Sequence, residues 1–261
     1  MFNKIRFFFR RLFAKKPPLE LSFSKIAAYR FCPWKYKLIY QDGWRVPPNP
    51  HISLGLTIHR TLEDFHKQDH KYLDDLLDIY DRVWVNEGFQ SPQQTVQFYE
   101  KGEKMLRQYI EWSHLRKSEI VAVEKEFRFK VGNRILRGII DRIDKLPDDT
   151  FEVIDYKTHA EMWDQDKIDT HLQLTLYALG CRNVMDAEQS SLGYYFLAHD
   201  KFVTTSRTQA QTDQALAELE AVARGIEKNN FTADKEKCPR CDFKASCKFS
   251  SVPKEAAGAK A

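Results

Sequence analysis

The stretch Gly138-Ile139-Ile140-Asp141-Arg142-Ile143-Asp144, with Val153-Ile154-Asp155-Tyr156-Lys157 after it, decides the fold predicted for this chain. Asp and Lys are poor strand formers, yet here they interrupt runs of Ile and Val that favour strands. The segment between the two runs, Leu-Pro-Asp-Asp-Thr at 146–150, is typical of a turn. The pattern therefore predicts a β-hairpin. Its charged positions are candidates for function, because functional sites are where sequences break local rules.

Alternation of side chains places Asp155 and Lys157 on one face of the second strand, about 7 Å apart at the backbone. Asp141 belongs to the partner strand and reaches the same face if the register allows it. Two carboxylates meeting there would repel each other unless a divalent cation lay between them. A lysine beside that cation suits a phosphoryl substrate. The alternative is a surface hairpin with a cross-strand Asp–Lys pair.

The composition is that of an ordinary soluble globular protein, with 261 residues, 43% of them hydrophobic and 30% charged. This length predicts one large domain or a domain with appendages. Five cysteines form an odd set, and no cleavable signal peptide is evident. We therefore expect a reducing cytoplasm, with cysteines used for metal binding or chemistry. No apolar run is long enough to span a bilayer. No Walker-type loop is present, which argues against ATP hydrolysis through that motif.

The net charge of +4 is unevenly distributed along the chain. Residues 1–16 hold six Lys and Arg and no acid, so the other 245 residues carry 35 basic and 37 acidic side chains. Any nucleic-acid surface must therefore be a local arrangement. Residues 1–18 form a basic, aromatic leader that could lie on a membrane surface or dock on a partner, and a disordered leader is the alternative. The main domain is expected at 19–250, followed by a disordered tail at 251–261.

Helices are expected first, then an antiparallel set of strands, then further helices and strands. Helices are predicted at 22–40 with a break at Pro33, at 55–66, within 71–117, at about 170–180 and at 209–228. Strands are predicted at 120–131, 135–145, 151–157, 192–198 and 202–206. This order indicates an α/β fold with a mixed sheet. His59 lies beside the apolar stripe of the helix at 55–66.

The cysteines suggest a metal site that joins the two ends of the domain. Cys238, Cys241 and Cys247 have the spacing Cys-x2-Cys-x5-Cys, and Cys32 is the fourth candidate, about two hundred residues earlier. Zinc and an iron–sulfur cluster both accept four thiolates. Structural zinc usually has two tight cysteine pairs, and Cys32 has no near partner, so we favour the cluster over zinc. Free buried thiols are the remaining alternative. Cys181 is interpreted as a core residue.

Taken in order, these motifs resemble the RecB-like branch of the PD-(D/E)XK nuclease superfamily. The chain is similar to the members with a [4Fe–4S] cluster, which are CRISPR-associated RecB-like exonucleases and AddB-type nuclease domains. The resemblance spans about residues 20–250. The motifs that carry it are Cys32-Pro33, Gly55-x3-His59, Gly138-Ile-Ile-Asp141-Arg142, Asp155-Tyr156-Lys157, Gln173-x3-Tyr177 and the cysteine trio.

The resemblance implies a restriction-endonuclease-like core, with a central mixed β-sheet flanked by helices and the N- and C-terminal segments joined by a metal cluster. It implies that His59, Asp141, Asp155 and the carbonyl of Tyr156 bind catalytic Mg²⁺ or Mn²⁺. Lys157 would position the attacking water or stabilise the charge that develops. Gln173 and Tyr177 would line the site near the nucleic-acid backbone, and Cys32, Cys238, Cys241 and Cys247 would hold the cluster. The sequence has Asp155 where Glu is often found, and Ile140-Asp141 in place of Pro-Asp.

The function implied is a metal-dependent deoxyribonuclease that hydrolyses phosphodiester bonds. We expect an exonuclease or a single-strand-preferring nuclease in DNA repair, recombination or CRISPR adaptation, with a helicase or CRISPR integrase as partner. The alternative is a non-cleaving, cluster-stabilised DNA-binding subunit of a larger helicase or integrase complex.

Neighbouring polar residues receive weaker assignments. Asp144 is interpreted as a strand-end or turn residue, and Arg142 is expected to pair with a neighbouring acid. Glu126 is expected to approach the site from the preceding strand. Three histidines have no support beyond their residue type: His66, His159 and His171.

Overall fold

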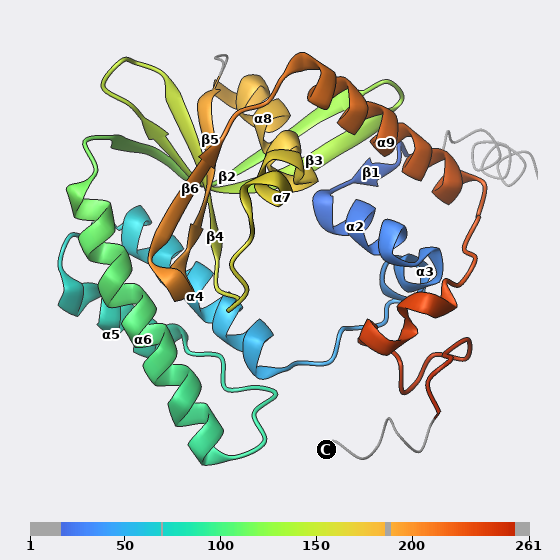
Figure 1. The fold of residues 1–261 in the computed structure, drawn as a ribbon, viewed down its shortest axis with the longest axis horizontal. Coiled ribbons are helices and arrows are strands. Elements are labelled where there is room, and N and C mark those ends of the chain that lie inside the picture. Colours follow the sequence, from blue (N-terminus) through green and yellow to red (C-terminus); the bar gives the residue numbers. More distant parts are fainter. Residues whose placement is uncertain (1–16, 69, 186–188, 254–261) are drawn as a thin grey trace, which may run out of the picture.

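A six-stranded mixed sheet forms the centre of the molecule (Figure 1). The computed structural model describes residues 17–68, 70–185 and 189–253. The leader predicted at 1–18 and the tail predicted at 251–261 therefore lie almost entirely outside the described residues. The strand order is β1-β3-β4-β5-β6, and β2 pairs with β3. Helices flank this sheet, as the predicted fold class requires.

The predicted hairpin is present as β3 (Arg134–Lys145) and β4 (Phe151–Lys157). The two strands are antiparallel, with Arg142 opposite Ile154 and Ile143 opposite Val153. The turn is closed by a hydrogen bond from the Leu146 amide to the Thr150 carbonyl, 2.8 Å long. The turn chemistry of 146–150 thus fixes the register that positions the charged side chains.

The remaining strands extend this hairpin on both sides. β2 (Glu119–Val131) is antiparallel to β3 along its whole length, and β5 (Gln189–Phe196) is parallel to β4. β6 (Lys201–Thr205) follows the short helix η1 (Leu197–His199), which ends β5 earlier than predicted. β1 (Glu20–Leu21) pairs with residues 135–136. The sequence did not predict β1, because two residues are too few to show an alternating pattern.

Side chains that alternate along the central strands divide the interior into two hydrophobic clusters. Val153 of β4 and Tyr194 of β5 belong to one cluster, whereas Ile154 and Tyr195 belong to the other. The first is covered by α8 (Leu172–Met185) and α9 (Gln209–Glu227). The second is covered by α4 (Pro50–Lys67), α5 (Leu73–Val83) and α6 (Pro92–Leu115). Burial on both faces explains the continuous apolar runs in β4 and β5.

Gly138 of β3 is needed for packing. A Cβ atom at Gly138 would lie 2.4 Å from Cζ of Phe127, and one at Gly180 of α8 would lie 2.4 Å from Cδ1 of the same ring. The Phe127 ring thus fills the space that two glycines leave between β3 and α8. This close approach holds α8 against the hairpin.

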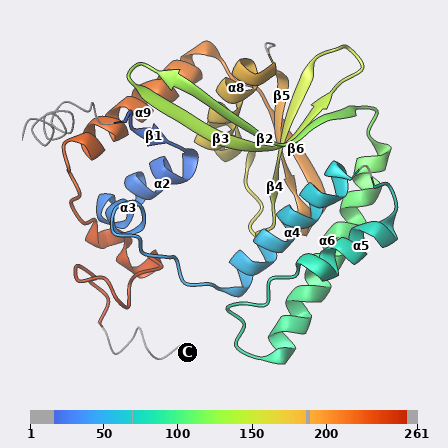
Figure 2. The same cartoon turned by 180° about the vertical axis from the view of Figure 1, so that it is seen from behind.

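The two ends of the domain lie side by side, as predicted. α2 (Phe23–Phe31) and α3 (Pro33–Tyr40) pack near the short helix η2 (Lys235–Arg240) and the segment after it (Figure 2). The Trp34 and Phe249 rings are 4.8 Å apart, and Nζ of Lys35 lies 2.5 Å from Oδ2 of Asp242. We call this part, residues 23–40 and 235–250, the cysteine lobe.

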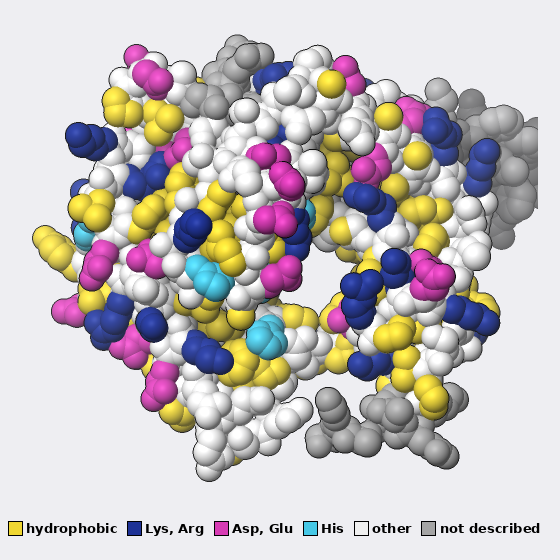
Figure 3. Space-filling model, in the orientation of Figure 1, with side chains coloured by type: hydrophobic (Ala, Val, Ile, Leu, Met, Phe, Trp, Pro, Cys, Tyr) yellow, Lys and Arg dark blue, Asp and Glu magenta, His cyan; other side chains and the backbone are white. Residues whose placement is uncertain are grey.

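An opening remains between the cysteine lobe and the main body. Residues 41–49 link α3 to α4 along one side of it (Figures 1 and 2). The space-filling view shows that side chains do not fill this opening, and that Lys and Arg side chains gather on its cysteine-lobe side (Figure 3). Within the described residues, no helix is long and apolar enough to cross a membrane.

Candidate active site

Asp155 and Lys157 project from the end of β4 and contact each other. The Lys157 Nζ atom lies 2.6 Å from Oδ2 of Asp155, whose side chain is almost completely buried. The Lys157 ammonium also lies 4.7 Å from the centre of the Tyr194 ring. The alternation of side chains in β4 therefore places the carboxylate and the ammonium together, as the sequence predicted.

Asp141 reaches this site from the neighbouring strand. Its Oδ2 atom accepts a hydrogen bond from the Tyr156 backbone amide, 2.9 Å long. Burial raises the pKa of Asp141 well above its usual range, and the nearby Asp155 carboxylate raises it further. Two buried carboxylates thus converge on one region, and their mutual repulsion favours a bound proton or cation there.

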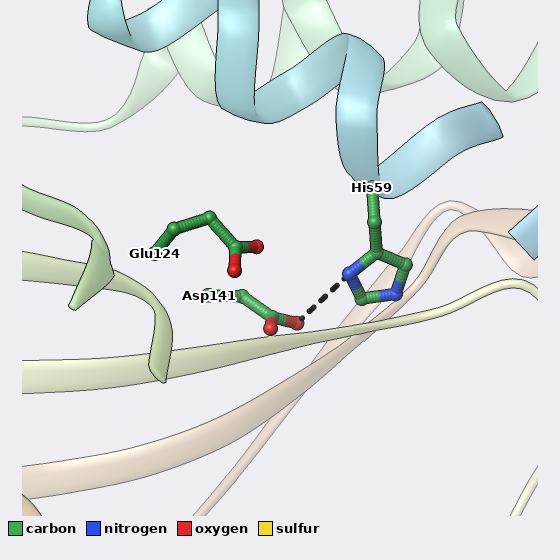
Figure 4. Close-up of side chains that lie close together, drawn as sticks. All are labelled: His59, Glu124 and Asp141. Carbon is green, nitrogen blue, oxygen red and sulfur yellow. Dashed lines mark ion pairs between the residues drawn. The ribbon is translucent and has the colours of Figure 1, made fainter. Parts of the chain in front are cut away.

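His59 approaches the same carboxylate from α4. Its Nδ1 atom is 3.5 Å from Oδ2 of Asp141 (Figure 4). Burial lowers the pKa of His59, which favours the neutral imidazole that can bind a metal. Gly55, one turn earlier, lies against the strand end, since a Cβ atom there would be 3.3 Å from Oγ1 of Thr158. The Gly55-x3-His59 spacing therefore brings α4 close enough for the imidazole to face the hairpin.

Glu124 is a site residue that sequence reasoning missed. Its carboxylate, the His59 imidazole and the Asp141 carboxylate offer ligand atoms that all lie within 4.8 Å of one another (Figure 4). Burial raises the pKa of Glu124 to about 7, with further contributions from Asp141 and Glu63. Its backbone has φ of 47°, a left-handed conformation that costs energy for a residue other than glycine.

The prediction that Glu126 approaches the site from this strand was wrong. Its carboxylate pairs with Nε of Arg137 at 2.7 Å on the exposed side of the sheet. The strand β2 has an irregularity between Ile120 and Ala122 and a left-handed residue at 124. Simple alternation therefore fails in β2. The one signal in the sequence was a charged residue after the apolar run at 121–123.

Gln173 and Tyr177 complete the site from α8. Nε2 of Gln173 donates to Oδ1 of Asp155 over 2.7 Å, and Nζ of Lys157 donates to Oε1 of Gln173 over 2.9 Å. Gln173 also donates to the Tyr177 hydroxyl over 3.0 Å. The amide thus holds both the carboxylate and the ammonium in place. The nucleic-acid contact that the resemblance implies for Gln173 and Tyr177 stays a prediction.

Asp144 is the penultimate residue of β3, which confirms its interpretation as a strand-end residue. Asp144 is fully buried, and its carboxylate accepts from Nε of Arg142 at 2.6 Å and from Nε of Arg116 at 3.1 Å. The expected pairing of Arg142 with a neighbouring acid is confirmed. Arg142 also donates to the Tyr109 hydroxyl. This buried network supports the far side of β3, where a charge needs a partner to be tolerated.

The other histidines have structural partners. Nε2 of His66 is 2.6 Å from the Tyr109 hydroxyl, and Nδ1 of His171 is 2.6 Å from the Tyr194 hydroxyl. The His159 ring stacks on Trp163. These contacts fix the rings without placing them among the candidate metal ligands.

One small cavity in the cysteine lobe is lined by all four predicted cluster ligands, which are Cys32, Cys238, Cys241 and Cys247. The Asp234 amide donates to Sγ of Cys32 over 3.4 Å. Within the described residues, His59, Glu124 and Asp141 are the only such ligand group within 4.8 Å, so no three sulfurs are that close. Zinc and an iron–sulfur cluster would each require these sulfurs to converge, so the identity of a metal group at this cavity stays a prediction.

Cys181 lies apart from this cavity. It is fully buried in α8, and burial raises the pKa of its thiol to about 11. This environment is that of an inert core thiol, which confirms its interpretation as a core residue.

The donor set around Asp141 has the chemistry of a divalent-cation site. Carboxylate oxygens and one imidazole nitrogen suit Mg²⁺ or Mn²⁺ better than a thiolate-seeking metal. The raised pKa values of Asp141 and Glu124 reflect burial and mutual repulsion that a cation would relieve. Next to these ligands lies the ammonium group of Lys157, which contacts with Asp155 and Gln173 hold at the edge of the site. This arrangement can polarise a phosphodiester.

A family model described as the PD-(D/E)XK nuclease superfamily matches residues 20–248. The chain therefore belongs to the PD-(D/E)XK nuclease superfamily. This places it among nucleases and hydrolases, and the matched range includes every residue of the candidate site.

Curated relatives come from Streptococcus pyogenes. The chain is 26% identical over 164 residues to a subunit of the ATP-dependent helicase/deoxyribonuclease of serotype M3, and 27% identical to the corresponding protein of serotype M6. Each match covers 58% of this chain and 15% of the relative, so the chain corresponds to a small part of these proteins. The crystal structure of a protein from Eubacterium rectale, provisionally described as an exonuclease, has a TM-score of 0.55 at 11% identity. The structural match covers 93% of this chain and 94% of the Eubacterium rectale chain, and it shows that the two share a fold.

Proposed function

We propose that this protein is a Mg²⁺- or Mn²⁺-dependent deoxyribonuclease that hydrolyses phosphodiester bonds. The observation that carries the proposal is the position of the His59–Glu124–Asp141 group beside Asp155 and Lys157. An oxygen-rich cation site next to a half-buried, oriented ammonium is what in-line phosphodiester hydrolysis requires.

Each residue has a distinct part in the proposed reaction. His59, Asp141 and Glu124 would hold the cation, together with Asp155 and the Tyr156 carbonyl. The bound cation supplies Lewis acidity and lowers the pKa of a water molecule. Lys157 offsets negative charge on the scissile phosphate or orients the attacking water. Asp155 and Gln173 hold the Lys157 ammonium in place, so that it need not reorganise during the reaction.

The proposed substrate is single-stranded DNA or a strand with a free end. The opening beside the cysteine lobe supports this, because it is bounded by protein around its rim in the space-filling view (Figure 3). The Lys and Arg side chains on its cysteine-lobe side would attract a polyanionic strand. The chemistry itself places few demands on base identity, so we expect little sequence preference.

We further propose that the four cysteines of the lobe hold a [4Fe–4S] cluster. The shared cavity supports a common metal site, and the lack of a near cysteine partner for Cys32 in the sequence favours a cluster over zinc. Such a cluster would join Cys32 in the N-terminal part to the C-terminal trio, and its contribution would be to folding. Anaerobic purification tests this. A brown protein with iron and sulfide supports the cluster, and a colourless protein with stoichiometric zinc contradicts it.

The proposed setting is the cytoplasm, in DNA repair, recombination or CRISPR adaptation. The names of the streptococcal relatives include a helicase activity, which supports a helicase as partner. A CRISPR integrase is the other partner we consider. The rival function is a DNA-binding subunit that does not cleave. The full set of His59, Asp141, Asp155 and Lys157 favours catalysis, because binding alone does not need a cation site beside an ammonium.

The proposal is tested by hydrolysis of labelled single-stranded DNA with Mn²⁺. The wild type should cleave, and the Asp141→Ala and Lys157→Ala variants should not. A wild type that binds DNA without cleaving it would support the rival function. Equal cleavage by all three proteins would contradict the catalytic assignment. Comparing linear with circular single strands then tests the need for a free end.

A further inference from the structure

Two cavities lie at opposite ends of α4, on either side of the candidate metal site. The first, of about 430 Å³, lies between the C-terminal ends of α4 and α6 and strand β2. Its basic and titratable lining residues are His66, Lys67, His70, Lys71, His114 and Arg142. Residues 120–123 of β2 form an apolar wall, and residue 124 of the metal site comes directly after them. We call it the C-terminal cavity.

The second cavity, of about 240 Å³, lies between the first turns of α4, the middle of α6 and the segment after β4. Its basic residues are His51, Lys101 and Lys104, and Phe98 and Met105 provide apolar surface. Thr158 also lines it, next in sequence to the candidate catalytic Lys157. We call it the N-terminal cavity.

Helix α4 connects the two cavities. His51 and Lys67 are each eight residues from His59, so they lie about 80° around the helix axis from it, one on each flank. His59 is eight residues from His51 and eight from Lys67, which places each cavity about 12 Å along the helix from the metal ligand. A strand that crosses α4 obliquely, with its scissile phosphate near His59, would reach one cavity in each direction.

The charge of the cavity walls is one-sided. Among the described residues that line the two cavities, none is Asp or Glu, although the chain contains 37 acidic residues. Some of the basic groups pair with acids outside the cavity, as Arg142 does in its buried pair within β3. Nζ of Lys67 is 2.5 Å from Glu63, and Nδ1 of His70 is 3.5 Å from Asp75.

The preference of positive charges for the C-terminal ends of helices explains only part of this distribution of basic residues. Cations are favoured at helix C-termini, which accounts for His66, Lys67 and His114. Lys101 and Lys104 lie in the interior of α6, where the helix dipole gives them no such advantage. Basic residues at both cavities therefore point to a shared anionic ligand.

We propose that the two cavities are nucleotide subsites that hold a single strand along α4 on both sides of the scissile phosphate. The basic side chains would contact the phosphates, and the apolar walls at Phe98 and residues 120–123 would contact bases. This inference rests on the proposed nuclease function for the identity of the strand. It adds the path of the substrate and the residues that bind it.

Charge insertion in each cavity tests the proposal without removing core residues. Gln108→Glu adds a negative charge to the N-terminal cavity at nearly constant volume, and Val121→Glu adds one at the partly exposed edge of the C-terminal cavity. Gln97→Glu and Val96→Glu are matched controls on the exposed surface of α6, outside both cavities. Binding of an oligothymidylate of about 20 nucleotides is measured with Ca²⁺ in place of Mn²⁺.

Each cavity variant should weaken binding about five- to tenfold relative to its control, and the effect should shrink at high salt. Binding by both cavity variants within about twofold of the controls would overturn the proposal. Mn²⁺-dependent cleavage by the wild type is measured in parallel. If the wild type fails to cleave but the cavity variants still bind weakly, the strand path stands and the nuclease function fails. If the wild type cleaves and all variants bind alike, the strand path fails alone.

Discussion

Gln173 donates a hydrogen bond to Asp155 over 2.7 Å, and the same amide accepts one from Lys157 over 2.9 Å. A neutral amide between a carboxylate and an ammonium satisfies both, because it offers an N–H to one and an oxygen to the other. It therefore fixes the geometry of the direct ion pair, in which Nζ of Lys157 lies 2.6 Å from Oδ2 of Asp155. Gln173 is best understood as a positioning residue.

Replacing this amide by a carboxylate should uncouple the pair. Gln173→Glu cannot donate to Asp155 when ionised and places a third negative charge beside it. We expect kcat for Mn²⁺-dependent cleavage to fall about 10- to 100-fold, the range seen when outer partners of metal ligands are changed. Tyr177→Phe keeps both amide contacts and serves as the control. A Gln173→Glu enzyme with the kcat of Tyr177→Phe would show that the amide does not position the site.

Glu124 should make Mn²⁺ affinity depend on pH. Its pKa is raised to about 7, first by burial and then by Asp141, so it must lose a proton to bind a cation near neutrality. We expect affinity to rise as pH increases from about 6 to about 8, through the pKa of Glu124, and to level off above that range. In Glu124→Gln the affinity should be at least about tenfold lower at pH 8 and the pH dependence shallower. Isothermal titration with Mn²⁺ measures both, and a variant with wild-type affinity would exclude Glu124 as a ligand.

The same carboxylate should destabilise the metal-free protein at neutral pH. The pKa of Glu124 is raised in the folded state from 4.5 to about 7, by burial and by the Asp141 and Glu63 carboxylates. Its contribution to stability is therefore full below about pH 4.5 and is lost as pH rises towards 7. Glu124→Gln avoids this loss, so its Tm in a chelator should exceed that of the wild type at pH 8, and the gap should narrow by pH 5. An equal gap at both pH values would contradict the assignment.

The buried pair of Arg142 and Asp144 should be important for stability. Asp144→Asn leaves the Arg142 guanidinium without its compensating charge, and breaking a buried pair in this way costs about 3–5 kcal/mol. Urea unfolding measures the loss. Asp149→Asn removes a carboxylate from an exposed pair with Lys145, and should change stability by less than about 0.5 kcal/mol. Equal losses in the two variants would contradict the structural role of Asp144.

Gly138 should resist substitution for steric reasons. Gly138→Ala brings a methyl group to within contact of the Phe127 ring, where a Cβ would lie 2.4 Å from Cζ. Overpacking of this kind costs about 1–3 kcal/mol. Adding Phe127→Leu should recover part of that loss, because the smaller side chain vacates the space. Additive losses in the double variant would show that the two residues do not clash.

The hairpin and its charged side chains could be predicted from the sequence because alternation and turn chemistry are local properties. Asp155 and Lys157 share a face for that reason alone. Glu124 could not be predicted, since its position depends on a left-handed backbone that breaks the alternation of β2. The burial of Asp144 could not be predicted, because Arg116, which pairs with it, lies 28 residues earlier in the chain. The strand β1 escaped prediction because two residues carry no periodic signal.

The central claim is that one site on this hairpin hydrolyses DNA, and Asp155→Asn tests it most directly. Asparagine keeps the shape of the aspartate but removes its charge, so the fold should persist. The measurement is the rate of nucleotide release from a labelled linear single strand at saturating Mn²⁺. We predict that the wild type releases nucleotides and that Asp155→Asn is slower by at least about a hundredfold. Equal rates in the two proteins, or no release by the metal-loaded wild type, would contradict it.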